Sequence, residues 1–341
     1  MSGDDGMTVS DGLDPETSHM HSEGISDKYS GASQSGAMNE EQSRPSRLPL
    51  FLAWTMLLVA SPIAIIPWRI FTIGEPFWWP WMHGIILLLL LLLTLVLQPL
   101  KPLRRFAFII VVIFFMGYAA GWNWGLIGFV QSTDFWAAWK IQAPMGAFDI
   151  SLHLLRLTPA AIVLSFLLLT GRKRQRFFLV KGDPHAVLER SSLVSTKKPE
   201  PWIRVALIFS LVFVLVAALF MVAVYGVSGE TFASNWPLIP VVLLIATMNG
   251  FNEEFTLRAA PLGELEPVIG KSNSLKTTAA YFGLGHYFGF PSGVIGVILS
   301  GFLGWFLGKS MLETKGIFVA WLVHFLTDVP IFLFLIVGGV A

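Results

Sequence analysis

Long apolar segments recur along the chain after residue 47, and they constrain the fold more than any other feature of the sequence. A helix needs about 20 mostly apolar residues to cross the hydrocarbon core of a bilayer. Only 13% of the residues are charged, whereas a soluble domain carries about 25%. We therefore predict an all-α polytopic membrane protein of about nine transmembrane helices, near 48–67, 79–99, 105–121, 151–170, 202–226, 236–258, 275–290, 292–308 and 316–340.

Changes in composition divide the chain into four regions. Residues 1–47 hold nine acidic and three basic residues and almost no apolar run, which predicts a disordered acidic tail. Residues 48–170 are expected to form an N-terminal region of four membrane helices, followed by a basic loop over 171–201. Residues 202–341 form the second membrane region, in which most of the intramembrane polar residues lie.

Lysine and arginine gather in alternate loops, and this predicts the orientation of the chain. The segments 101–105 and 171–176 are strongly basic, whereas the loops at 72–77 and 227–235 hold no Lys or Arg. Loops rich in Lys and Arg stay in the cytoplasm. We expect an integral protein of a bacterial plasma membrane with a cytoplasmic N-terminus and the C-terminus outside.

Charged residues interrupt the sixth apolar segment in "ATMNGFNEEFTLRAAP". An ionised side chain at the bilayer centre costs roughly 2.5–3.5 kcal/mol, so the helix either leaves the membrane here or uses these charges. Glu254 precedes Arg258 by four residues, the favourable order for an ion pair on a helix. Glu253 points elsewhere and shares a face with Asn249. We expect Glu254, Arg258 and Asn249 to give structural support and Glu253 to be left without a charged partner.

Two later apolar segments also hold polar residues. His286 lies in "YFGLGHYFG", and His324 precedes Asp328 by four residues in "HFLTD", which places both on one helical face. At 1.5 Å per helical residue, His286 lies roughly 15–18 Å from the inner surface, and the other two lie at overlapping depths of roughly 10–20 Å. These depths predict a polar cavity that these residues share with Glu253.

The side chains of such a cavity suit hydrolysis. A carboxylate in an apolar setting can act as general base on water, one histidine can orient that water, and a second can donate to the oxyanion. Alternatively, Glu253, His286, His324 and Asp328 could hold a single divalent metal such as zinc. Because the chain has no cysteine, any metal site has to use His, Asp or Glu. The residue types fit both a metal-dependent and a metal-independent mechanism.

Three motifs in this region resemble those of a known family. "EEFTLR", "FGLGH" and "HFLTD" match the E-E-x-x-x-R, F-x-x-x-H and H-x-x-x-N/D motifs of the CPBP family, the CAAX protease and bacteriocin-processing (Abi) intramembrane proteases. The resemblance covers about 200–341. It implies an endopeptidase with a cytosol-facing cavity, in which Glu253 and His286 activate water and His324 and residue 328 stabilise the oxyanion.

Two positions depart from the family pattern. Residue 328 is Asp where the eukaryotic CAAX proteases have Asn, and an ionised Asp cannot donate to an oxyanion, so Asp328 would orient His324 or bind metal. Ala259 stands where many relatives have Gly, and Pro261 is then expected to end the helix.

These observations predict an intramembrane, glutamate- or metal-dependent endopeptidase. Its partners would be the lipid bilayer and a membrane-associated protein or peptide substrate, with no nucleic acid. The alternative is a non-catalytic membrane protein of the CPBP fold with an immunity or adaptor role. A proton-coupled transporter is less favoured, because such proteins more often contain internal repeats and the sequence has none.

Overall fold

Helices form the secondary structure of the part of the chain that the computed structural model describes, namely residues 47–71, 76–118, 124–194, 196, 198–226, 229–289 and 292–338. Within these ranges there is no β-strand, and an isolated antiparallel bridge joins Val187 and Pro201. The tail predicted over 1–47 lies outside the described residues, apart from Arg47, which begins the first helix. The prediction of an all-α fold is confirmed.

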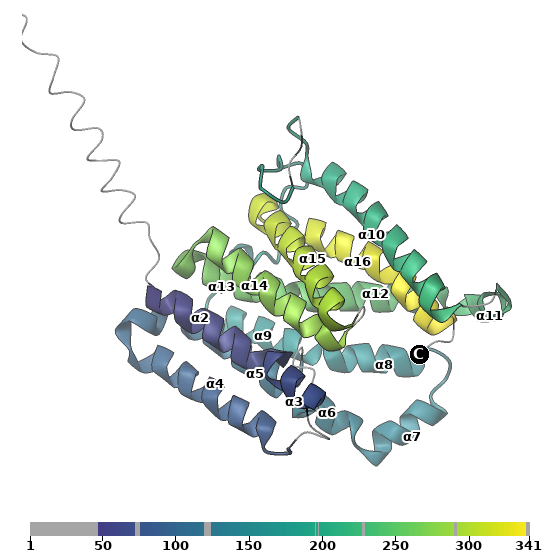
Figure 1. Ribbon diagram of the computed structural model, residues 1–341, viewed down its shortest axis with the longest axis horizontal. Helices are drawn as coiled ribbons and strands as arrows, with labels where there is room; N and C mark the ends of the chain where they lie inside the picture. Colours follow the sequence, from purple (N-terminus) through teal and green to yellow (C-terminus); the bar gives the residue numbers. More distant parts are fainter. Residues whose placement is uncertain are drawn as a thin grey trace, which may run out of the picture. The chain divides into compact units, whose positions relative to one another are not determined.

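Figure 1 shows how these helices are arranged. In chain order they are α2 (Arg47–Ala60), η1 (Pro62–Ala64), α3 (Ile65–Phe71), α4 (Trp79–Val96), η2 (Gln98–Leu103), α5 (Arg104–Phe115), α6 (Gly125–Gln131), α7 (Asp134–Gln142), α8 (Ala147–Arg156), α9 (Thr158–Leu169), η3 (Arg174–Phe177), α10 (Trp202–Tyr225), α11 (Gly229–Asn235), η4 (Trp236–Leu238), α12 (Ile239–Glu253), η5 (Glu254–Ala259), α13 (Ala260–Ile269), α14 (Lys271–Gly285), η6 (His286–Phe288), α15 (Gly293–Thr314), α16 (Phe318–Phe332) and η7 (Leu333–Val337).

Among the described residues, seven helical segments are long and apolar enough to cross a membrane. They are Arg47–Phe71, Trp79–Val96, Ala147–Leu169, Trp202–Val224, Gly229–Ile269, Gly293–Thr314 and Phe318–Val337. The other two segments predicted as spans, 105–121 and 275–290, are helical as α5 and α14 but extend over only 12 and 15 residues. The protein is therefore a polytopic, all-α membrane protein.

Helices α14 and α15 pack against each other along their length (Figure 1). A Cβ atom on Gly283 would lie 2.7 Å from the carbonyl oxygen of Val297 and 2.9 Å from the Cα atom of Gly301, so the two backbones meet where side chains are absent. Glycines on both α14 and α15 thus allow close helix packing. This packing fixes the end of α14, where His286 follows.

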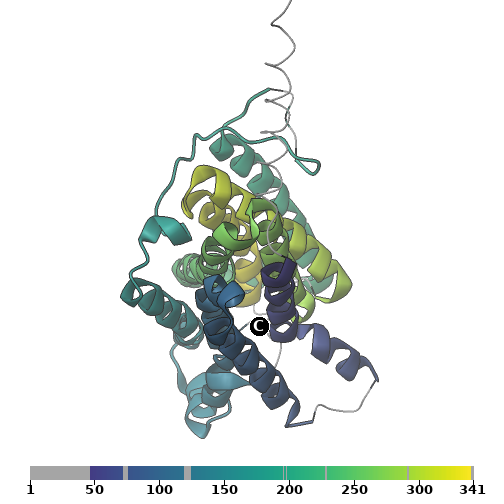
Figure 2. The same ribbon diagram turned by 90° about the vertical axis from the view of Figure 1, so that its left-hand side faces the viewer.

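Helix α12 lies between α8 and α16, and all three contribute to the candidate site described next. A Cβ atom on Gly146, before α8, would lie 3.0 Å from the Val241 side chain near the start of α12, and Asn252 at its end donates to the Arg156 carbonyl. The two helices therefore run parallel. The N-terminal helices α2 and α5 pack against α13 and α14, as Figure 2 also shows.

Candidate active site

The two glutamates lie inside a long helix, where α12 passes into the π-helical segment η5. The N–H of Ala260 bonds the carbonyl of Phe255, five residues back, and α13 then continues to Ile269 with Pro261 in its first turn. Proline is tolerated there because the N–H groups of a first helical turn need no partner in that helix. The expectation that Pro261 ends the helix is wrong. Glu253 and Glu254 consequently face neighbouring helices rather than water beyond a helix end.

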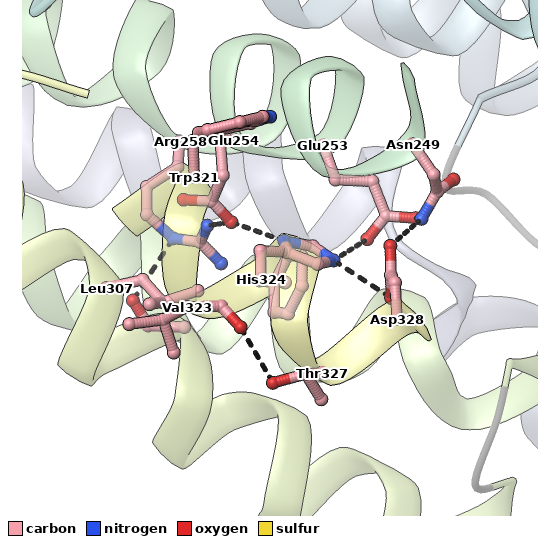
Figure 3. Close-up of polar contacts among 12 residues, drawn as sticks. Asn249, Glu253, Glu254, Arg258, Leu307, Trp321, Val323, His324, Thr327 and Asp328 are labelled. Carbon is pink, nitrogen blue, oxygen red and sulfur yellow. Dashed lines mark hydrogen bonds and ion pairs between the residues drawn. The ribbon is translucent and has the colours of Figure 1, made fainter. Parts of the chain in front are cut away.

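Glu254 and Arg258 form the predicted ion pair, and both side chains are fully buried. The Arg258 guanidinium also donates to the Gly304 carbonyl at 3.2 Å and lies 4.2 Å from the centre of the Phe282 ring. The same Glu254 oxygen, Oε1, accepts a hydrogen bond of 2.6 Å from Nδ1 of His324 (Figure 3). Glu254 thus connects the arginine to the histidine and fixes the orientation of the imidazole ring.

Glu253 points the other way, toward the far edges of both histidines. Its Oε2 atom lies 3.6 Å from Nε2 of His324 and 3.9 Å from Nε2 of His286. These separations exceed a direct hydrogen bond and leave room for a bridging water. Oε2 is buried and has no hydrogen-bond partner among the described residues. An unpartnered carboxylate oxygen therefore faces two imidazole rings.

Asn249 holds the two remaining carboxylates in place. Its amide nitrogen donates to Oε1 of Glu253 at 3.3 Å and to Oδ2 of Asp328 at 3.0 Å (Figure 3). The other oxygen of Asp328, Oδ1, lies 3.6 Å from Nε2 of His324. The sequence-predicted site residues from α12, the end of α14 and α16 are thus brought together.

A cavity of about 400 Å³ opens beside these side chains. Its polar wall consists of Tyr118, Arg156, Asn249, Glu253, His286, His324 and Asp328, and its apolar wall includes Leu257, Phe288, Ile331, Phe332 and Leu335. A second, mostly apolar cavity of about 170 Å³ lies between α10, α15 and α16 and reaches His286, His324 and Asp328. Polar and apolar parts of a ligand could therefore both find complementary walls.

Sequence reasoning missed two residues of this cavity, Arg156 and Tyr118. Nη2 of Arg156 lies 3.8 Å from Oε1 of Glu253, so the expectation that Glu253 has no charged partner needs correction. Helical spacing could not reveal this partner because it comes from a different helix. The one available signal was an arginine inside an apolar segment, since such residues are rare there and mark functional sites by default.

Two further histidines lie in helices α4 and α8 and bond backbone carbonyls. Nδ1 of His83 bonds the Val59 carbonyl at 2.8 Å, and Nδ1 of His153 bonds the Asp149 carbonyl at 2.9 Å. Each ring thus bonds a backbone carbonyl near one end of its helix, and neither ring is part of the polar wall of the cavity.

The same side chains are of the types that bind divalent metals. Among the described residues, no group of three or more His, Asp and Glu side chains is placed to hold an ion. Nδ1 of His324 is bonded to Glu254, and Nδ1 of His286 is bonded to the Phe282 carbonyl at 2.9 Å, so each ring has only Nε2 available. Bonds of this kind to the second ring nitrogen are also usual for ligating histidines, so Glu253, His286, His324 and Asp328 would be the residues to hold a metal, and the reaction proposed below is written for the side chains and water alone.

Comparison with known proteins agrees with the position of the site. Residues 234–330 match the family model described as type II CAAX prenyl endopeptidase Rce1-like. No curated protein and no solved structure matches the chain. The matched region contains Glu253, His286, His324 and Asp328, whereas Tyr118 and Arg156 lie outside it. The match is consistent with the CPBP family, and it confirms the resemblance of this region to the CAAX proteases.

Proposed function

We propose that the chain is an intramembrane endopeptidase that hydrolyses peptide bonds of membrane-associated proteins or peptides. The match of residues 234–330 to a CAAX endopeptidase family and the apolar helices support this class of function. The observation on which the proposal rests is the buried Oε2 atom of Glu253, which lies within 4 Å of Nε2 of both His286 and His324.

Glu253 and His286 would act on one water molecule. The Phe282 carbonyl can only accept a hydrogen bond, so Nδ1 of His286 is the donor and Nε2 of the neutral ring is an acceptor. A water between Nε2 and Oε2 of Glu253 can donate one hydrogen to each. Its lone pair is then free to attack a peptide carbonyl carbon while Glu253 takes the proton.

His324 would stabilise the oxyanion that this attack creates. Because Nδ1 donates to Glu254, Nε2 can donate only when the ring is a doubly protonated imidazolium. Glu253, Glu254 and Asp328 all lie within 4 Å of this ring and stabilise its positive charge. Glu253 then passes its proton to the leaving amine as the C–N bond breaks, which yields a carboxylic acid and a free amine, and the acid releases its remaining proton to solvent.

The mouth of the site would accept an apolar segment of substrate. Its walls include Leu257, Phe288 and Ile331, and the apolar cavity between α10, α15 and α16 lies next to the same histidines. In the orientation predicted by the basic loops, the substrate would enter from the cytoplasmic side of the membrane.

Cleavage of a membrane-tethered reporter by the purified protein in vesicles tests this proposal. Glu253→Gln, which keeps the size of the side chain, should lower the cleavage rate about 100- to 10,000-fold, the usual contribution of a general base. Glu230→Gln makes the same chemical change on exposed α11 and should have no effect. Undiminished cleavage by Glu253→Gln would show that the proposal is wrong. An immunity or adaptor role would instead leave a cellular phenotype intact in this variant, without cleavage.

A further inference from the structure

Arg156 is a charged residue within an apolar helical segment. It ends α8, and Pro159 in the first turn of α9 interrupts the helix just after it, within the apolar segment Ala147–Leu169. A charged residue inside a membrane segment is costly and is kept where it pairs with another group or binds a ligand.

The backbone of Arg156 is held firmly against α12. Nδ2 of Asn252 donates to the Arg156 carbonyl at 2.8 Å, and Oδ1 of Asn252 accepts from the Thr256 hydroxyl at 3.1 Å. Asn252 immediately precedes Glu253, so this contact fixes the arginine beside the proposed general base. A ligand group bound by Arg156 would therefore lie close to the reacting atoms.

The guanidinium itself is only loosely paired. It lies 3.8 Å from Glu253, whereas the pair of Arg172 with the buried Glu264 has two hydrogen bonds of 2.7 and 2.6 Å. The Arg156 side chain is 35% exposed and lines the cavity. Its donors thus remain available to a ligand in the cavity.

A second donor lies beside it. The guanidinium is 5.6 Å from the centre of the Tyr118 ring and interacts with the buried Tyr118 hydroxyl, which can accept from the arginine and still donate its own hydrogen to a ligand. A guanidinium and a phenol together offer three or more N–H and O–H groups to one acceptor. Arginine binds carboxylates with two parallel hydrogen bonds, which makes a carboxylate the best-matched ligand.

We propose that Arg156 and Tyr118 form a binding subsite for a carboxylate group of the substrate, close to the bond that is cut. This inference rests on the proposed peptidase function and specifies its substrate class. Since one extended residue spans about 3.3–3.6 Å, the carboxylate belongs to a residue one or two positions from the scissile bond. The carboxylate is either the C-terminus of the substrate or an Asp or Glu side chain, and the experiment separates these two sources.

Binding of matched fluorescent decapeptides in phosphatidylcholine vesicles tests the subsite. The peptides share one apolar sequence and end in a free acid, in an amide, or in an amide with one Glu in the last two positions. Wild type should bind the free acid about 10- to 100-fold more tightly than the plain amide. Tight binding of the Glu-containing amide would identify a side-chain carboxylate as an accepted source.

Variants assign this preference to Arg156. Arg156→Gln should bring the ratio of acid to amide affinity close to one. Arg156→Lys should keep part of the preference, because lysine retains the positive charge but lacks the planar guanidinium that donates two parallel hydrogen bonds. Arg204→Gln, on an exposed arginine paired with Glu200, is the control and should leave the ratio unchanged. Tyr118→Phe should lower the ratio several-fold and serves as the second variant if Arg156→Gln does not fold.

Several outcomes would overturn the subsite: no binding of the acid by wild type, equal binding of acid and amide, or an unchanged ratio in Arg156→Gln. Cleavage of the same peptides is measured separately. An acid preference in binding without cleavage would contradict the peptidase proposal and leave the subsite standing. Cleavage of the peptides without an acid preference in binding would contradict the subsite and leave the peptidase proposal standing.

Discussion

At the scale of single residues, the site depends on the different contacts made by two adjacent glutamates. Glu254 lies on the buried side with Arg258 and fixes His324 through Nδ1, so the free nitrogen of that ring faces the cavity. Glu253 faces the cavity itself, with Oε2 directed at both histidines. Asn249 links Glu253 to Asp328, which makes the roles of these carboxylates interdependent.

Replacement of Asp328 by Asn separates the two mechanisms that the sequence left open. The Asn side chain can still accept the hydrogen bond from Asn249, and its amide can donate to an oxyanion. We expect Asp328→Asn to keep reporter cleavage within about 10-fold of wild type. Elemental analysis of the same preparations should find no stoichiometric metal in the active protein. Stoichiometric zinc that is lost together with activity in Asp328→Asn would contradict the water mechanism.

At the scale of helices, two local features place the site. The π-helical segment Glu254–Ala259 lets one helix continue past Pro261, and π-helical turns occur frequently at functional sites. The close approach of α14 and α15 at Gly283 positions His286 three residues later. Small errors in either feature would misplace an imidazole or a carboxylate by about 1 Å, enough to lower the rate about 100-fold.

Two glycines that face each other across α14 and α15 make a matched test of this packing. Gly283→Ala places a Cβ atom 2.7 Å from a backbone oxygen, so the helices have to move apart at a cost of about 1–3 kcal/mol. For Gly301→Ala the nearest atom is 3.8 Å away, and higher helix propensity should stabilise the protein by up to about 1 kcal/mol. The unfolding temperature in detergent and the rate of reporter cleavage should both fall for Gly283→Ala and should not fall for Gly301→Ala. Equal behaviour of the two variants would contradict the packing argument.

Helical spacing predicts the contacts of the site that lie within one helix, and similar depths in the membrane predict the cavity shared by three helices, but neither rule predicts the contributions of Arg156 and Tyr118. The pairs of Glu254 with Arg258, Asn249 with Glu253, and His324 with Asp328 all follow from a spacing of four residues. The contact of Arg156 with Glu253 joins positions 97 residues apart, and no local rule predicts it. The π-helical segment was missed for another reason, because proline usually signals a helix end.

At the scale of the whole molecule, helices far apart in the chain complete one cavity. Tyr118 follows α5 and Arg156 ends α8, whereas the remaining polar wall comes from α12, the end of α14 and α16. The first two lie outside the region matched by the family model. The N-terminal membrane helices therefore contribute to the cavity as well as to packing.

The predicted orientation decides from which side substrate reaches this cavity. The chain has no native cysteine, so single-cysteine variants can be labelled without background. An impermeant maleimide should label Glu230→Cys on α11 from outside intact cells, and Ser192→Cys in the basic loop only after the membrane is opened. Labelling of Ser192→Cys in intact cells would reverse the orientation and the side of substrate entry.

The claim at the centre of this account is that Glu253 and His286 act on the same water molecule, and a double-mutant cycle tests it most directly. The quantity is kcat/KM for reporter cleavage by wild type, Glu253→Gln, His286→Gln and the double variant. Residues that act as a unit lose their effect together, so the double variant should be no slower than the slower single variant, within about threefold. If the two losses instead multiply, the residues act independently and the shared-water mechanism is wrong.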